Sequence, residues 1–303
     1  MSTNKNSKMS AAYLIVSLCL TAVSVVLRAL DLFFFFDSDL GYYTSGAILP
    51  IVANVLLFAG VIFFIVFSFI FFRKEKVEYK TARSVPERAI LIAAAVCSAV
   101  LTVSNAVDII LKDRSSVVLF IFSAFCTVYF ITDFFNFKKE TKVELGAIFL
   151  VRLTIMLATS YFDQNVQMNS PDKLLFGIAC VAAMFFIVSE MKVAVGSARP
   201  AVHIIASSSA ALLCSASAIP SIIAYPAGRL PASGDVYFEY FLLLGVAVLA
   251  VFRLISVMSA IKNGKASPKA DSKEMTATVS EDAEQTVSAD NSETNETKED
   301  TEN

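Results

Sequence analysis

Long apolar runs alternate with short polar segments along the first 262 residues of the chain. Eight of the apolar runs contain about 20 residues, the length that an α-helix needs to cross the hydrocarbon core of a bilayer, about 30 Å thick. We therefore predict an all-α fold, a polytopic transmembrane helical bundle of about eight spans. The predicted spans are residues 11–35, 47–72, 89–111, 116–137, 145–162, 173–195, 201–224 and 236–259.

The same pattern divides the chain into three parts. Residues 1–10 form a short N-terminal segment, residues 11–262 form the eight-helix domain, and residues 263–303 are rich in Ser, Thr, Glu and Asp. The last part has almost no apolar residues to bury, so we predict a disordered acidic tail. Both a solvating tail and a docking or regulatory segment fit its composition. The weakest span boundary is Lys112–Ser115, where a single re-entrant segment is the alternative to two spans.

The distribution of Lys and Arg predicts the orientation. Cytoplasmic loops of membrane proteins carry an excess of these residues. With the N-terminus inside, the predicted cytoplasmic segments hold seventeen Lys and Arg residues and the outer segments hold only four: Lys112, Arg114, Lys173 and Arg229. Both termini are therefore predicted to be cytoplasmic. In this orientation the spans form four hairpins, each closed on the outer face.

Three of these predicted hairpins share a short motif in their second span. An aromatic residue, Phe and Ile recur at residues 63–65, 129–131 and 185–187, and each run is followed by a polar residue. Tandem duplication of a hairpin, a common origin of transporters, produces such repeats. Chance matches between Phe-rich membrane helices produce them as well, and the eighth span lacks the run.

The composition argues against several classes of protein. The five cysteines lie inside apolar runs without Cys-x-x-Cys spacing, which predicts buried thiols and neither disulfides nor a metal site. The sequence has one histidine and no metalloprotease, nucleophile-elbow or phosphate-loop motif, so we predict no enzyme activity and no cofactor. The basic segment 73–88 also contains three glutamates and is interpreted as a membrane anchor rather than a nucleic-acid site.

The seventh predicted span differs from the others because small residues recur along it every four positions. Ser207, Ala211 and Ser215 fall on one line of the helix surface, and Ala206, Ala210, Cys214 and Ala218 fall on the next. Small residues allow helices to approach closely in lipid. We expect this helix to be central and surrounded by protein. A helix that lines a pore or a substrate path, with Ser208 and its neighbours offering hydroxyls, is the functional alternative.

Charged residues inside the predicted spans are the most informative feature, because each costs several kcal/mol in hydrocarbon unless it is paired or hydrated. Depth along the helices sorts them into an outer and an inner layer. Arg28 and Asp31 share a helix face and are expected to pair, with Asp108 or Glu239 as other partners for Arg28. Arg152 is the deepest charge, and its expected partner is Asp133 or Glu190.

These charges define the candidate substrate-binding residues. The set is Arg152, Arg28, Asp31, Asp133, Glu190, Glu239 and Ser208. Structural ion pairing and snorkelling from the helix ends remain the alternative interpretation. We expect a multi-pass protein of a cell membrane, typical of a bacterial cytoplasmic membrane, that transports a small molecule or ion through a polar intramembrane cavity. The alternative function is a sensory or regulatory membrane domain that relays a signal to cytoplasmic partners.

Overall fold

The computed structural model describes residues 2–37, 41–73, 85–111, 116–132, 134–135, 138–163, 170–230 and 234–262. Eight helices lie within these ranges, and each overlaps one of the apolar runs that predicted it. Their bounds are α1 Ser2–Phe34, α2 Ile48–Phe71, α3 Val85–Ile110, α4 Ser116–Ile131, α5 Lys139–Phe162, α6 Pro171–Val195, α7 Pro200–Ala224 and α8 Gly234–Lys262. The predicted acidic tail lies outside the described residues.

A short β-hairpin, which the apolar pattern did not predict, follows α1. Strand β1, Phe36–Asp37, pairs antiparallel with β2, Tyr42–Tyr43, through two residues of each strand. The aromatic rings of Phe36 and Tyr43 meet edge to face, with centroids 5.5 Å apart. This hairpin marks one end of the helical bundle, which we call the hairpin end. The opposite end, where the chain leaves α8, is the tail end.

Among the described residues, seven helices are long and apolar enough to cross a membrane. The exception is α4, which has 16 residues and so extends about 24 Å, less than the usual hydrocarbon thickness. Its predicted span ran to residue 137, whereas the helix ends at Ile131. The outward surface of the helices is strongly apolar. On α2, large exposed side chains follow one another at helical spacing: Ile48, Ile51, Val52, Val55, Phe58 and Ile62.

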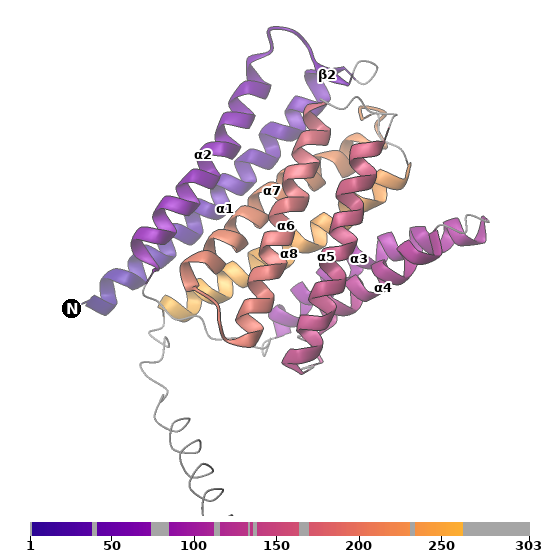
Figure 1. The fold of residues 1–303 in the computed structure, drawn as a ribbon. Helices are drawn as coiled ribbons and strands as arrows, with labels where there is room; N and C mark the ends of the chain where they lie inside the picture. Colours follow the sequence, from indigo (N-terminus) through magenta and orange to yellow (C-terminus); the bar gives the residue numbers. More distant parts are fainter. Residues whose placement is uncertain are drawn as a thin grey trace, which may run out of the picture. The chain divides into compact units, whose positions relative to one another are not determined.

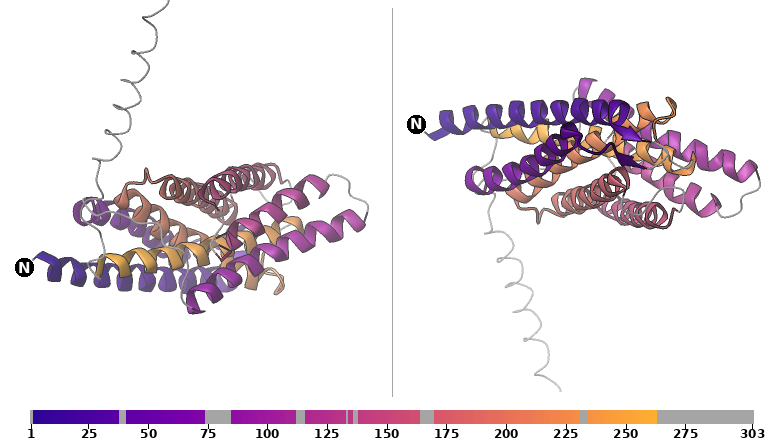
Figure 2. Two further views of the ribbon diagram at one scale, coloured as in Figure 1. Left: turned by 90° about the horizontal axis from the view of Figure 1, so that it is seen from below. Right: turned by 90° about the horizontal axis from the view of Figure 1, so that it is seen from above.

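Helix α7 lies at the centre of the bundle, as its small residues predicted. It packs against α1, α2, α6 and α8, and 20 of its 25 residues are buried, among them Ala206, Ala210 and Cys214. Figure 1 shows α1 and α2 on one side of α7. The two further views show the hairpin of α3 and α4 projecting on the side away from α1 and α2 (Figure 2). Helix α8 contacts α7, α1 and α3 and so joins the two sides.

The approach of α8 to α3 depends on a glycine. A Cβ atom at Gly245 would lie only 2.9 Å from the backbone oxygen of Ala94, a distance that a real Cβ atom essentially never shows. A backbone oxygen in a packed helix has little room to move. The absence of a side chain at Gly245 therefore lets the two helices pack at this distance.

This close approach leads to a first prediction, the replacement Gly245→Ala. We expect the free energy of unfolding to fall by about 1 to 3 kcal/mol, the usual cost of overpacking a core. Gly177→Ala is the matched control, because its Cβ would meet only Leu157 Cδ1, at an ordinary 3.4 Å. In the control, alanine's helix propensity favours folding by up to about 1 kcal/mol. Unfolding by SDS in mixed micelles measures both, and equal midpoints for the two variants would contradict the packing argument.

Candidate functional site

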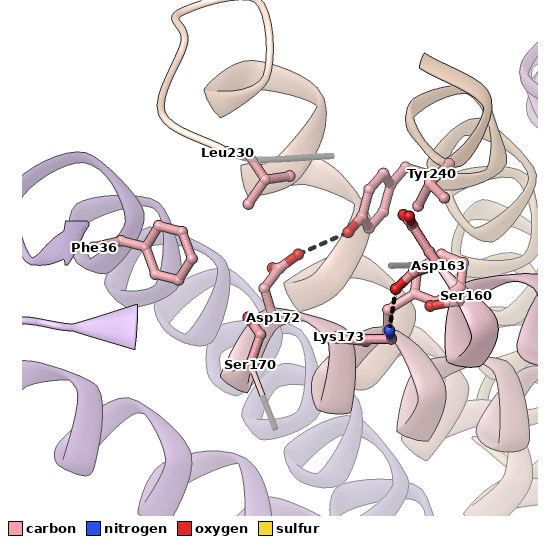
Figure 3. Close-up of a pocket in the computed structure, with 10 residues that line it drawn as sticks. Phe36, Ser160, Asp163, Ser170, Asp172, Lys173, Leu230 and Tyr240 are labelled. Carbon is pink, nitrogen blue, oxygen red and sulfur yellow. Dashed lines mark hydrogen bonds between the residues drawn. The ribbon is translucent and has the colours of Figure 1, made fainter. Parts of the chain in front are cut away.

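Four polar side chains meet near the hairpin end, and we call them the hairpin-end cluster: Arg28, Asp31, Asp172 and Tyr240. The Arg28 Nη1 atom lies 3.6 Å from Asp31 Oδ2 on the same helix. Its Nη2 atom donates a hydrogen bond of 3.2 Å to Asp172 Oδ1 on α6. Tyr240 on α8 donates a hydrogen bond of 2.8 Å to the other oxygen of Asp172 (Figure 3). The cluster therefore ties together α1, α6 and α8.

Local sequence explains why Asp172 stands where these helices meet. Pro171 is the first residue of α6, a position where proline's fixed φ and missing N–H are tolerated. Asp172 follows in the first turn, where the helix dipole favours a negative charge. The ring of Phe176, one turn later, meets the ring of Tyr240 edge to face at 5.1 Å and positions the phenol beside the carboxylate.

Several atoms of this cluster are buried without a hydrogen bond. Arg28 and Asp31 are 1% and 0% exposed. Nevertheless, Nε and Nη1 of Arg28 and both carboxylate oxygens of Asp31 lack hydrogen-bond partners. The guanidinium lies over the ring of Tyr43, 5.3 Å from its centroid, which offsets part of this cost. A buried polar atom without a partner costs about 1 to 3 kcal/mol, and such groups are common where a ligand or water binds.

A small polar cavity adjoins the hairpin-end cluster. Its volume is about 20 Å³, room for about one water molecule. Asp172, Lys173, Ser170 and Tyr240 line it together with apolar side chains (Figure 3). Ser170 is fully buried, and its hydroxyl has no hydrogen-bond partner. The Lys173 ammonium donates a hydrogen bond of 2.8 Å to the backbone oxygen of Asp163.

A second buried ion pair joins α5 to α8. Nη1 and Nη2 of Arg152 donate hydrogen bonds of 3.3 and 3.2 Å to Oε1 of Glu239, and its Nε donates one of 3.3 Å to the Ser123 hydroxyl on α4. The Asn105 amide on α3 donates a hydrogen bond of 2.9 Å to the same hydroxyl. Arg152 and Glu239 are 1% and 6% exposed. One charged pair thus connects four helices.

The tail end of the bundle contains a third group, which we call the tail-end cluster: Glu190, Lys142, Arg253 and His203. Oε2 of Glu190 on α6 accepts hydrogen bonds from Lys142 Nζ at 3.1 Å and from Arg253 Nε at 3.0 Å. Its other oxygen lies 3.5 Å from His203 Nε2. The second ring nitrogen of His203 is 2.7 Å from the Ser189 hydroxyl. This cluster ties together α5, α6, α7 and α8.

Ser208 belongs to a neutral contact apart from these charges. Its hydroxyl lies 2.8 Å from the Tyr13 hydroxyl, which is also 3.2 Å from the hydroxyl of Ser68. Tyr13 is 1% exposed and packs among phenylalanine rings of α2. The contact joins α1, α2 and α7. It satisfies the Ser208 hydroxyl within the protein.

The two clusters lie far apart along the bundle. Asp172 and Glu190 are eighteen residues apart on α6, which corresponds to about 27 Å along a helix. Between them the facing surfaces of α6 and α7 are built from small buried residues. These are Ala179, Cys180, Ala183, Ala210, Ala211 and Cys214. The Cys214 thiol donates a hydrogen bond of 3.4 Å to the backbone oxygen of Ala179, so the two helices lie in direct contact at mid-depth.

The predicted pairing of Arg28 with Asp31 is present in the structure. The expected partner of Arg152 was wrong where it named Glu190, because Glu190 bonds Lys142 and Arg253 and Arg152 bonds Glu239. Glu239 was also an alternative partner for Arg28, but it bonds Arg152, and Arg28 bonds Asp172 instead. Asp133, the other expected partner of Arg152, lies outside the described residues.

The sequence interpretation missed two charged members of these clusters. Asp172 and Lys142 were assigned to polar linkers, whereas both are buried within helices that begin earlier than the apolar runs. The signal for Asp172 was present in the sequence, because proline followed by an acidic residue is typical of a helix start. Lys142 carries no comparable signal, since a lysine flanking an apolar run ordinarily indicates the membrane interface.

No group of three or more His, Cys, Asp or Glu side chains that could hold a metal ion occurs among the described residues. Comparisons of the chain with protein-family models, with curated proteins and with solved structures find no match.

Proposed function

We propose that the chain crosses a cell membrane eight times, with both termini in the cytoplasm and the hairpin end outside, and that it transports a small molecule across that membrane. The hairpin-end cluster and the tail-end cluster serve as two gates. The described structure then corresponds to a closed state, because both clusters are formed and the polar cavity between α6 and α8 has room for about one water molecule.

The observation that carries this proposal is the placement of buried charges at both ends of the same two helices. At the hairpin end, Asp172 and Tyr240 bind α6 to α8 and, through Arg28, to α1. At the tail end, Glu190 and Arg253 bind the same helices to each other and to α5. Buried ion pairs add little net stability relative to apolar packing. Within a membrane such residues usually belong to a substrate or ion path.

The region between the clusters also suits a moving path. Small side chains let the backbones of α6 and α7 approach closely, so no large side chains interlock between the two helices when they shift. Two hydroxyls on α7, those of Ser209 and Ser217, are buried without a hydrogen-bond partner. Unsatisfied hydroxyls cost free energy in a static core, whereas a passing polar group or water satisfies them. A gate that opens at one end would expose this region to that side only.

The experiment is transport by the purified protein in lipid vesicles. The vesicles contain amino acids, sugars and inorganic ions, and their membrane carries a fluorescent short-chain phosphatidylcholine whose movement between leaflets is followed by dithionite quenching. At least one of these probes should cross faster than in protein-free vesicles. Deletion of residues 263–303 should leave that rate unchanged, whereas a domain that relays signals through its tail would lose its output.

A variant distinguishes transport from leakage. Asp31→Asn removes one carboxylate charge beside Arg28 but leaves the hydrogen bond from Arg28 to Asp172 in place, so it should lower the flux at least about tenfold while retaining the fold. Glu144→Gln removes an exposed carboxylate and should carry the flux of the unmodified protein. The proposal fails if no probe crosses faster than in protein-free vesicles, or if both variants transport equally.

A further inference from the structure

A groove between α5 and α6 has a volume of about 450 Å³. It begins near the hairpin end and opens on the side of the bundle. Its lining residues are Leu157, Ser160, Tyr161, Lys173, Leu174, Gly177, Ile178 and Val181. A glycine contributes to its width, because any larger side chain at Gly177 would extend toward Leu157. Apart from Ser160 and Lys173 its lining is largely apolar, and in the proposed topology the groove faces the surrounding lipid.

The polar part of this groove, near the hairpin end, adjoins the small cavity beside the hairpin-end cluster. Ser160 and Lys173 line both spaces. Beyond them, the small cavity adds the unpartnered hydroxyl of Ser170 and the hydrogen-bonded pair of Asp172 and Tyr240 (Figure 3). The apolar groove thus ends beside a buried group of hydrogen-bond donors and acceptors.

This combination matches one class of ligand, an amphiphile with an alkyl chain and a compact polar head. The alkyl chain is accommodated by the apolar walls, and a volume of several hundred Å³ is typical of ligand sites. The head would lie beside the small cavity, whose lining has one ammonium group, two carboxylates and three hydroxyls. Since the carboxylates outnumber the ammonium, a zwitterionic or neutral hydroxyl-bearing head fits better than an anionic one.

A second groove, between α3 and α4, provides the contrast. Its volume is about 360 Å³, and apart from Thr127 its walls are entirely apolar. The hydroxyl of Thr127 is already satisfied by the backbone oxygen of Ser123 at 3.2 Å and by the Ser98 hydroxyl at 3.1 Å. This groove has an apolar wall but no polar group free to hold a head. It is therefore a matched reference site for an alkyl chain alone.

We infer that the groove between α5 and α6 binds a membrane amphiphile, with the alkyl chain along Gly177 and the head at Ser160 and Lys173. The inference rests on the proposed function, in which this amphiphile is the transported substrate. It enters sideways from the lipid rather than from water. The head then lies next to Asp172, the residue through which the hairpin-end cluster closes the path.

The test uses a lysophosphatidylcholine whose acyl chain carries a photoreactive diazirine, added to the full-length protein in lipid nanodiscs. After illumination, mass spectrometry of the proteolysed protein locates the cross-links. We expect them to concentrate on the groove residues of α5 and α6. Cross-links spread evenly over the lipid-facing helices, or concentrated between α3 and α4, would overturn the inference.

Two variants make the result specific. Gly177→Leu fills the groove and should lower the cross-linking yield on α5 and α6 at least about fivefold, equivalent to about 1 kcal/mol of binding. Ala99→Leu fills the groove between α3 and α4 in the same way and should leave that yield unchanged. Equal yields in the two variants would overturn the assignment even if both fold normally.

The outcome is distinguishable from that of the transport proposal. In one outcome, a water-soluble solute crosses the vesicle membrane while the fluorescent phosphatidylcholine does not. That result would contradict an amphiphile as the substrate and would support transport. If the groove is cross-linked by the photoreactive lysophosphatidylcholine and none of the transport probes crosses the vesicle membrane, transport is contradicted and the binding site is supported.

Discussion

Replacement of Glu190 by glutamine should lower the free energy of unfolding by about 3 to 5 kcal/mol, the cost of removing one partner from a buried ion pair. The Glu190 carboxylate holds two cations, Lys142 and Arg253, through hydrogen bonds of 3.1 and 3.0 Å to the same oxygen. Glutamine has nearly the same shape but no charge. Its carbonyl oxygen can accept the hydrogen bonds, but it cannot offset the repulsion between the two cations.

The control is Glu140→Gln, which neutralises an exposed carboxylate in the first turn of α5. There the only expected loss is the interaction with the helix dipole, at most about 1 kcal/mol. Both variants are unfolded with SDS in mixed micelles while far-UV circular dichroism follows the helix content. Equal midpoints for the two variants would mean that Glu190 does not hold the tail end together.

The second large effect concerns Arg152 and Glu239. Arg152→Met leaves Glu239 without the guanidinium that donates two hydrogen bonds to it, so we expect a loss of about 3 to 5 kcal/mol. Changing Glu239 to leucine in the same protein also removes the buried carboxylate that has lost the Arg152 guanidinium. The double variant should therefore be more stable than Arg152→Met alone by about 1 to 3 kcal/mol.

A double-mutant cycle measures this coupling with the same SDS unfolding assay. The reference pair is Arg152→Met with Glu144→Gln, whose exposed carboxylate lies two turns before Arg152 on α5. In the reference pair the two effects should add. If the changes in the free energy of unfolding caused by Arg152→Met and Glu239→Leu also add, the result would contradict the ion pair between α5 and α8.

The sequence predicted the helical elements well because apolar length alone identifies a membrane helix. All eight apolar runs correspond to helices, and the small residues of the seventh run predicted the central position of α7. Arg28 and Asp31 were also predictable as a pair, since residues three apart on a helix are neighbours wherever the helix stands. Each of these features can be predicted from the sequence of a single helix.

Contacts between helices were predicted less well, and Arg152 illustrates the physical reason. Its partner was chosen by depth, under the assumption that the fifth span begins at residue 145. The helix actually begins at Lys139, so Arg152 lies about 20 Å from its start and only about 15 Å from its end. The long arginine side chain spans the remaining offset to Glu239, near the start of α8. Apolar pattern alone cannot locate a helix end that is built from charged residues.

The groove between α5 and α6 was not predictable from the sequence for a related reason. The residues Leu157, Gly177 and Val181 are ordinary members of apolar runs. They form a channel only because α5 and α6 lie side by side with a glycine between them. Lys173 was expected at the outer interface. In the structure it lines the cavity together with Ser160 on the neighbouring helix α5, a pairing that depends on how the two helices pack.

The central claim, that two charged clusters act as gates at opposite ends of the bundle, can be tested through Cys180 and Cys214. Both thiols are fully buried between the clusters. In a protein whose other three cysteines are changed to alanine, a membrane-impermeant methanethiosulfonate reagent is added to one side of the vesicles at a time. Labelling is measured by intact-protein mass spectrometry.

Asp172→Asn should open the hairpin end and allow labelling from the outside only, and Glu190→Gln should allow labelling from the tail-end side only. The protein with Asp172 and Glu190 intact should react slowly from both sides. Thiols that stay unreactive in both variants while the fold is retained would contradict the gates, and would make these charges structural.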